Sequence, residues 1–166
     1  MGPSWCWHPL LPRRETGVAV TDTADKVLLF ETILERASGE IGDFNAVTMD
    51  HFYRQHPAAR ASFETHALGN RARLEASMVN STLYCLMHWL ERPMEIRLIF
   101  NDQLPHHCET LHVDKAWFAG LVEALTDVLT STVPETEPAQ MMLCAELRTG
   151  LCDAIATAGK GLRRHR

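Results

Sequence analysis

The segment HCETLHVDKAWFAGLVEALTDVL, residues 107–129, decides how this chain is interpreted. After Asp114, apolar side chains recur at the three- and four-residue steps of a helix with one buried face. They are Trp117, Phe118, Leu121, Leu125 and Val128. Asp114 is a favourable N-cap residue, because its carboxylate can accept a hydrogen bond from a free backbone N–H of the first turn. The segment therefore predicts a helix that begins after Asp114.

Helical periodicity extends to both sides of this segment, and strand-like alternation is weak. The other expected helices run from about 23 to the glycines at 39 and 42, from 45 to 54, from 57 to about 63, from 71 to 90, from about 94 onward, and from 137 to 158. Asn45 is the expected cap of the second helix, and Pro105 is expected to interrupt or restart the helix that begins near 94. The sequence thus predicts an all-α domain of seven or eight helices.

Composition and charge exclude several classes of protein. The chain has 166 residues, 46% of them hydrophobic and 22% charged, with a net charge of −5, which is ordinary for one globular domain. An acidic chain is not expected to bind nucleic acid or an anionic membrane, and no run approaches the roughly 18 apolar residues of a membrane helix. We expect a disordered N-terminal extension over 1–20, the domain over 21–159 and a basic tail over 160–166.

The cysteines favour a reducing compartment. There are five of them, an odd number, and no CxxC pair occurs. The N-terminal residues also lack the basic-then-apolar order of a secretory signal. We therefore expect reduced thiols, no structural disulfide and a cytoplasmic protein.

Two motifs resemble the globin family. In HPAARASF, residues 56–63, Pro57 is followed six residues later by Phe63, as in the globin turn where a phenylalanine packs flat on the haem. In the segment 107–129, a histidine is followed six residues later by Val113 and then by an aromatic that opens the next helix, as on the proximal side of globins. The stretches ILERASGEIGDF and HFYRQHPAARASF look similar to single-domain bacterial globins. The order of elements agrees from about 23 to 158.

This resemblance implies a globin-like fold of about seven to eight helices around a haem pocket. It implies one non-covalent haem b, since no CxxCH attachment motif occurs, with the iron held by His107 and His106 as the alternative one residue away. The implied pocket residues are His107, Phe63, Val113, Met78, Leu74, Thr82, Phe118 and Met49. The implied function is reversible binding or sensing of a diatomic gas: oxygen, carbon monoxide or nitric oxide.

The side of the pocket opposite His107 departs from the family. The long helix carries Leu74 and Met78 where oxygen-storing globins usually place a histidine or glutamine. Met49 stands near the position of the tyrosine found in many bacterial globins, and Tyr53 lies a turn too late. Met78 is interpreted as pocket lining, with ligation of the iron as the alternative. Because a hydrogen-bond donor stabilises bound oxygen more than carbon monoxide, we expect weak oxygen binding and comparatively favoured carbon monoxide binding.

Other readings stay open. The first is a haem-free globin-like module that acts as a helical dimer or docking domain. The second is an unrelated four-helix metal protein, although no Glu-x-x-His pair supports it, and the third is a zinc site among His106, His107, Cys108 and His112. The histidines at 51, 56, 66 and 88 are interpreted as surface residues. No catalytic residue is predicted, though nitric-oxide or peroxide chemistry stays open. Expected partners are the gas and a separate reductase or signalling protein, with a homodimer left open.

Overall fold

The chain folds into helices throughout its described part. The computed structural model describes residues 22–159, and within that range it contains seven α-helices and no strand. They are α1 (Thr23–Ile41), α2 (Phe44–Gln55), α3 (Ala59–His66), α4 (Arg71–Trp89), α5 (Pro93–Glu109), α6 (Lys115–Thr130) and α7 (Pro138–Thr157). The all-α prediction is confirmed. The predicted extension over 1–20 and basic tail over 160–166 lie outside the described residues.

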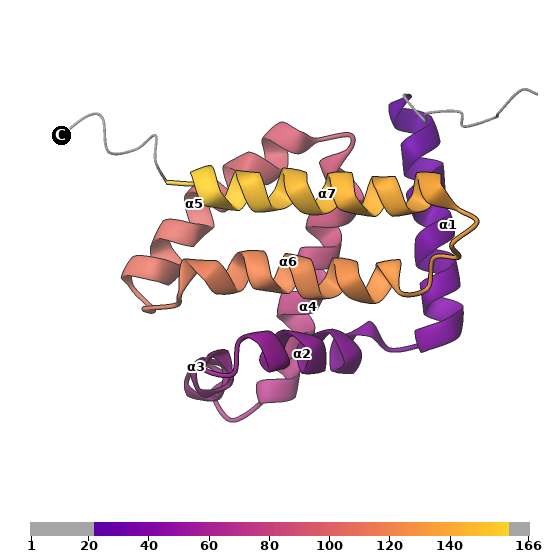
Figure 1. Cartoon of the computed structure of the whole chain (residues 1–166). Coiled ribbons are helices and arrows are strands. Elements are labelled where there is room, and N and C mark those ends of the chain that lie inside the picture. The colour runs from indigo at the N-terminus through magenta and orange to yellow at the C-terminus, as the bar shows by residue number, and fades with distance from the viewer. Residues whose placement is uncertain (1–21, 160–166) are drawn as a thin grey trace, which may run out of the picture.

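The helices form a layer with one long helix crossing it. In Figure 1, α6 and α7 run side by side in opposite directions, and α2 lies along the other side of α6. Helix α4 crosses behind this layer and packs on α2, α6 and α7. Helix α1 packs across one end, while α3 and the end of α5 lie at the other end. Helices α3 and α5 each pack on α4.

The ends of the helices test the predicted caps. The Asp114 side chain accepts a hydrogen bond from the backbone N–H of Ala116 at 2.9 Å, so this predicted cap is confirmed. The predicted cap Asn45 is wrong. Asp43 caps α2 instead and accepts from the Asn45 N–H at 2.9 Å. Helix α2 begins at Phe44, so its cap lies two residues before the one that the sequence indicated.

Pro105 does not interrupt α5, contrary to the prediction. The helix continues to Glu109, and its proline faces the end of α7. A Cβ atom built on Gly159 would lie 3.4 Å from Pro105, and the Gly159 N–H donates to the Asn101 side chain at 3.0 Å. A proline removes only one hydrogen bond from the helix ladder. Packing of α5 against α7 therefore carries the helix through it.

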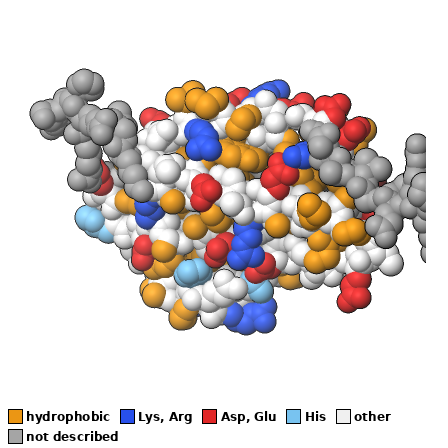
Figure 2. Space-filling view, turned by 45° about the horizontal axis from the view of Figure 1, so that its top comes forward, with side chains coloured by type: hydrophobic (Ala, Val, Ile, Leu, Met, Phe, Trp, Pro, Cys, Tyr) orange, Lys and Arg blue, Asp and Glu red, His pale blue; other side chains and the backbone are white. Residues whose placement is uncertain are grey.

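The core lies where α2, α4, α6 and α7 meet. The largest side chains that are almost completely buried include Ile33, Phe52, Leu86, Ile96, Leu125, Leu129, Leu147 and Leu151. Figure 2 shows the surface of one face, where hydrophobic side chains are mixed with acidic and basic ones. No helix among residues 22–159 is long and apolar enough to cross a membrane.

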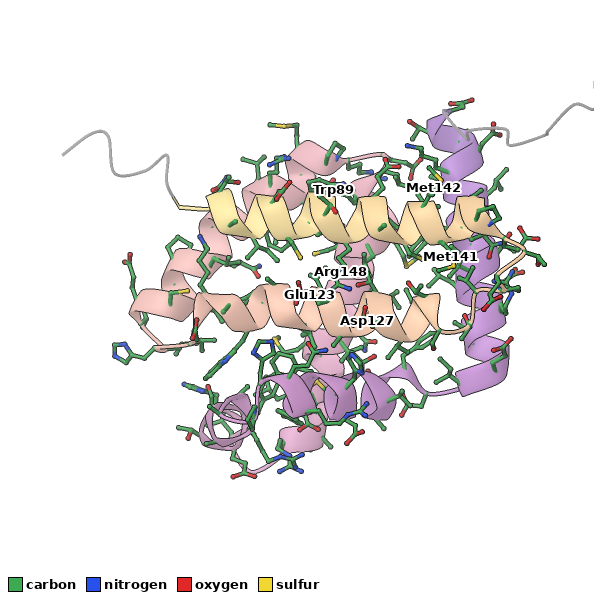
Figure 3. All side chains as sticks on the ribbon, viewed as in Figure 1. Trp89, Glu123, Asp127, Met141, Met142 and Arg148 are labelled. Carbon is green, nitrogen blue, oxygen red and sulfur yellow. The ribbon has the colours of Figure 1, made fainter. Side chains whose placement is uncertain are left out.

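Small residues let the helices approach closely. Gly150 of α7 faces Trp89 at the end of α4, and a Cβ built on this glycine would lie 2.5 Å from the indole Nε1. Figure 3 shows Trp89 beside α7, and it shows Arg148 reaching from α7 toward Glu123 and Asp127 of α6. The crossing of α4 and α7 thus depends on the missing side chain at position 150.

Candidate functional site

Two adjoining cavities open between α4 and the α5–α6 region. The α4–α5 cavity has a volume of about 720 Å³ and lies between the two helices that name it. The corner cavity has a volume of about 410 Å³ and lies between α3, α4 and the α5–α6 connection. Both are lined by Met78, His107, Phe118 and Leu121. These volumes fall in the roughly 300–1,000 Å³ typical of small-molecule and cofactor sites.

His107 is held in one defined orientation. Its Nδ1 atom lies 2.8 Å from the backbone carbonyl oxygen of Gln103, one turn earlier in α5. A carbonyl oxygen only accepts, so Nδ1 carries the proton and donates, and Nε2 keeps its lone pair. The ring edge also packs on Phe118, with ring centroids 5.6 Å apart. A neutral imidazole fixed through Nδ1 is the arrangement that metal-ligating histidines adopt.

Most of the predicted pocket residues lie on the cavity walls. Phe63, Leu74 and Val113 line the corner cavity, and Thr82 lines the α4–α5 cavity. Met78 and Phe118 line both. Their roles toward a cofactor remain predictions.

Two predicted positions lie elsewhere. Met49 is only 3% exposed, belongs to the core and lines neither cavity, because α2 turns this face toward its neighbouring helices. His106, the alternative to His107, is exposed and also lines neither cavity. Of these two histidines, only His107 lines a cavity.

His66 is a site residue that sequence reasoning missed. It was interpreted as a surface histidine, but it is half-buried at the end of α3 and lines the corner cavity. Its Nδ1 atom lies 2.8 Å from the carbonyl oxygen of Ser62. The spacing of three residues from Phe63, on the same face of a helix, is the signal that could have found it.

Arg73 is the one charged side chain that lines either cavity among the residues the structure describes. Residues 22–159 contain no ion-pair partner for it. The neighbouring Arg71, by contrast, pairs with Glu64 at 2.7 Å and with Glu75 at 3.0 Å. Arg73 therefore offers an uncommitted positive charge at the edge of the α4–α5 cavity.

The Tyr53 phenol points away from both cavities. Its O–H donates to the Glu75 carboxylate at 2.7 Å, and Tyr53 is 7% exposed. Burial, with the hydrogen bond to Glu75 and the negative charge of that carboxylate, raises the pKa of Tyr53 well above its ordinary range. Tyr53 is thus committed to a structural contact between α2 and α4.

The four cysteines among residues 22–159 do not form a metal site, and burial makes their thiols less reactive. Burial raises the pKa of Cys85, which lines the α4–α5 cavity, to about 11, so its thiol stays protonated at neutral pH. All four cysteines among residues 22–159 are free. The same range holds no group of three or more histidine, cysteine or acidic side chains that could bind a metal ion. The zinc reading of the histidines near 107 therefore has no support in the described part of the chain.

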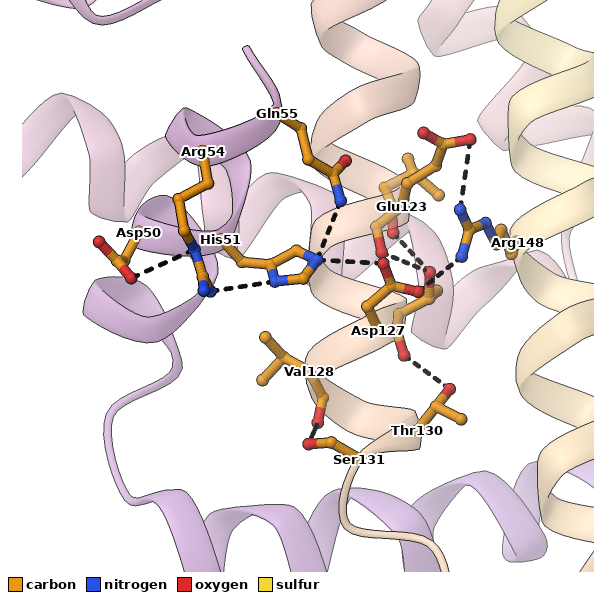
Figure 4. A network of polar contacts seen from close by, with 12 residues as sticks. Asp50, His51, Arg54, Gln55, Glu123, Asp127, Val128, Thr130, Ser131 and Arg148 are labelled. Atoms are coloured by element: carbon orange, nitrogen blue, oxygen red, sulfur yellow. Dashed lines mark hydrogen bonds and ion pairs between the residues drawn. The ribbon is translucent and has the colours of Figure 1, made fainter. Parts of the chain in front are cut away.

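A second polar cluster joins three helices at the surface (Figure 4). His51 of α2 contacts Asp127 of α6 at 3.1 Å, and Arg148 of α7 contacts the same carboxylate at 2.6 Å and Glu123 at 3.5 Å. Gln55 bonds to the His51 ring at 3.1 Å. Partly exposed pairs of this kind contribute roughly 0.2–1 kcal/mol each. Since these groups satisfy one another, the cluster ties α2, α6 and α7 together and offers no free group to a ligand.

Comparison with known proteins adds no relative. No protein-family model, no curated protein and no solved structure matches this chain significantly.

Proposed function

We propose that this chain is a globin-like protein that holds one haem b without a covalent bond, with His107 as the protein ligand of the iron, and binds a diatomic gas reversibly. One observation carries the proposal. The His107 side chain is fixed by its Nδ1–H on the Gln103 carbonyl at 2.8 Å, which leaves Nε2 available in the neutral ring, and His107 lines both cavities. A neutral imidazole is the usual protein ligand of haem iron in globins.

The surrounding residues fit the chemistry of a haem. A flat apolar macrocycle needs apolar walls, which Phe63, Leu74 and Val113 supply. Haem also carries two carboxylates, which must stay near water or meet a positive charge. Arg73, uncommitted among residues 22–159 and exposed at the edge of the α4–α5 cavity, is suited to that task.

A bound haem would supply an iron at which a small gas exchanges, and the protein controls what surrounds that gas. Met78 and Leu74 make the α4 wall apolar. The Thr82 hydroxyl donates to the Met78 carbonyl at 2.9 Å and is therefore already used within its own helix. Where the gas lies against Leu74 and Met78 in the corner cavity, this wall would offer no hydrogen-bond donor and would give little help to oxygen, whereas carbon monoxide needs that help far less. The site is thus better suited to carbon monoxide or nitric oxide than to oxygen storage.

Absorption spectra of the purified protein test this proposal. Wild-type protein mixed with one equivalent of haem is expected to give an intense haem band that shifts when the protein is reduced under carbon monoxide. His107→Ala is expected to lose or greatly weaken haem binding. His106→Ala is the matched control and is expected to bind haem like wild type, since its ring is exposed and lines neither cavity. An unchanged spectrum in His107→Ala would refute the role of this residue.

A haem-free interaction module is the second candidate. Several large apolar side chains are exposed on α5 and α7, with Met94 67%, Leu98 66% and Met142 69% accessible. Apolar side chains on helical surfaces are a means of docking to another protein. A colourless protein that takes up no haem, and that elutes as a dimer in size-exclusion chromatography, would favour this candidate.

A further inference from the structure

Two histidines line the corner cavity, and their rings make the same kind of hydrogen bond. His66 at the end of α3 and His107 near the end of α5 both line it. Each has its Nδ1 atom 2.8 Å from the carbonyl oxygen of the residue four positions earlier, Ser62 for His66 and Gln103 for His107. In both, the carbonyl fixes the proton on Nδ1, so both Nε2 atoms keep a free lone pair.

Few other polar groups lie on this cavity wall. The Thr65 hydroxyl donates to the Ala61 carbonyl at 2.9 Å, and the Ser62 hydroxyl oxygen lies 3.3 Å from the Nδ1 of His66, beside the carbonyl that accepts the Nδ1–H. The remaining lining residues are apolar: Phe52, Phe63, Leu68, Leu74, Met78, Leu111, Val113, Trp117, Phe118 and Leu121. Both histidines thus line a cavity whose other walls are mainly apolar, and imidazole nitrogens are ligands suited to haem iron.

The two histidines come from different helices, His66 from the end of α3 and His107 from α5. Figure 1 shows α3 and the C-terminal end of α5 at the same end of the molecule, but on separate helices that each pack on α4. The connection that follows His66 is short and has an unusual backbone, since Leu68 (φ 48°) and Gly69 (φ 86°) both adopt left-handed conformations. Leu68 is also 98% exposed.

We propose that His66 is a second protein ligand for the haem iron besides His107. This inference rests on the proposed function. With haem bound, a gas would have to compete with His66 for the iron, so this competition would set the gas affinity. The apparent affinity for carbon monoxide would then be the intrinsic affinity multiplied by the fraction of molecules in which His66 is not bound to the iron.

Haem-loaded wild-type protein and three variants test the proposal: His66→Ala, Met78→Leu and His106→Ala. Wild type is expected to show the resolved visible bands and the electron paramagnetic resonance signal of low-spin, bis-histidine haem. His66→Ala is expected to keep its haem, become high-spin and bind carbon monoxide with an apparent affinity about tenfold higher or more. Met78→Leu and His106→Ala are expected to stay low-spin. Far-UV circular dichroism shows whether each variant folds, and His66→Gln is the second variant if His66→Ala does not.

The outcomes separate this inference from the proposed function. Two outcomes would overturn the role of His66 and leave the proposed function standing. One is a wild-type protein that binds haem through His107 but is high-spin. The other is haem that stays low-spin in both His66 variants. If Met78→Leu becomes high-spin and His66→Ala does not, the second ligand is the methionine, and the proposed role of His66 is wrong. Failure of the wild type to bind haem at all would overturn both.

Discussion

Replacing Gly120 by alanine is expected to destabilise the fold at the crossing of α2 and α6. A Cβ atom built on Gly120 would meet the imidazole of His56, with the ring atom Cδ2 at 2.7 Å and Cε1 at 3.1 Å. His56 has little room to retreat, because it caps α2 and its ring packs on Phe52 with centroids 5.2 Å apart. The added methyl group must therefore move a ring that is held on its other side.

The size of the effect follows from two opposing contributions. Overpacking of this kind costs about 1–3 kcal/mol. Alanine in place of a glycine within a helix gains about 1 kcal/mol of helix propensity. Since the ring at position 56 is buttressed, we expect a net loss of about 1–2 kcal/mol. At about 2–4 °C per kcal/mol for a protein of this size, the melting temperature should fall by about 2–8 °C.

Gly39→Ala is the matched control. Gly39 also lies within a helix, but a Cβ built on it would have nothing within 4 Å. This variant keeps the propensity gain without the clash, so its melting temperature should rise by about 1–4 °C. Thermal and urea melts followed by circular dichroism measure both variants. A Gly120→Ala protein as stable as the Gly39→Ala protein would show that the imidazole moves aside freely, and would refute this reasoning.

Three further predictions concern Tyr53, Arg73 and the thiols. Tyr53→Phe should lower the free energy of unfolding by about 1.5–3 kcal/mol at pH 7, because a hydrogen bond to the Glu75 carboxylate is lost. The pKa of the Tyr53 phenol is raised in the folded state, so the wild type should lose stability as the pH rises above about 10. The difference in unfolding free energy between the wild type and Tyr53→Phe should therefore shrink. Urea melts of both proteins at pH 7 and above pH 10 measure this difference, and a constant value would contradict the prediction. Arg73→Ala should weaken haem binding up to about fivefold at low salt and less at high salt. Haem titrations measure the affinity, with Arg54→Ala as the control. Equal haem affinities of Arg73→Ala and the wild type at low salt would argue against a contact between Arg73 and the haem carboxylates. A reductant should leave the melting temperature unchanged, since all four described cysteines are free, and a marked drop would reveal a disulfide.

The sequence alone determined which segments are helical and which faces they bury. Leu121, Leu125 and Val128 are buried as their spacing predicted, and Asp114 caps its helix as predicted. These features depend on residues within one or two turns of each other, so local spacing is sufficient to predict them. The candidate site was predictable to the same extent: Phe63, Val113 and His107 come from local motifs, and all three line the corner cavity.

Only the tertiary structure decided which side chains face the cavities. Packing against α7 carries α5 through Pro105, and the crossing of α2 with its neighbours buries Met49 in the core and directs the Tyr53 phenol to Glu75. His66 reaches the corner cavity only because α3 and the end of α5 lie at the same end of the molecule. Helical periodicity reports which face of a helix is buried, but not which distant helix covers it. Residues far apart in the chain become neighbours through packing angles that no local pattern contains.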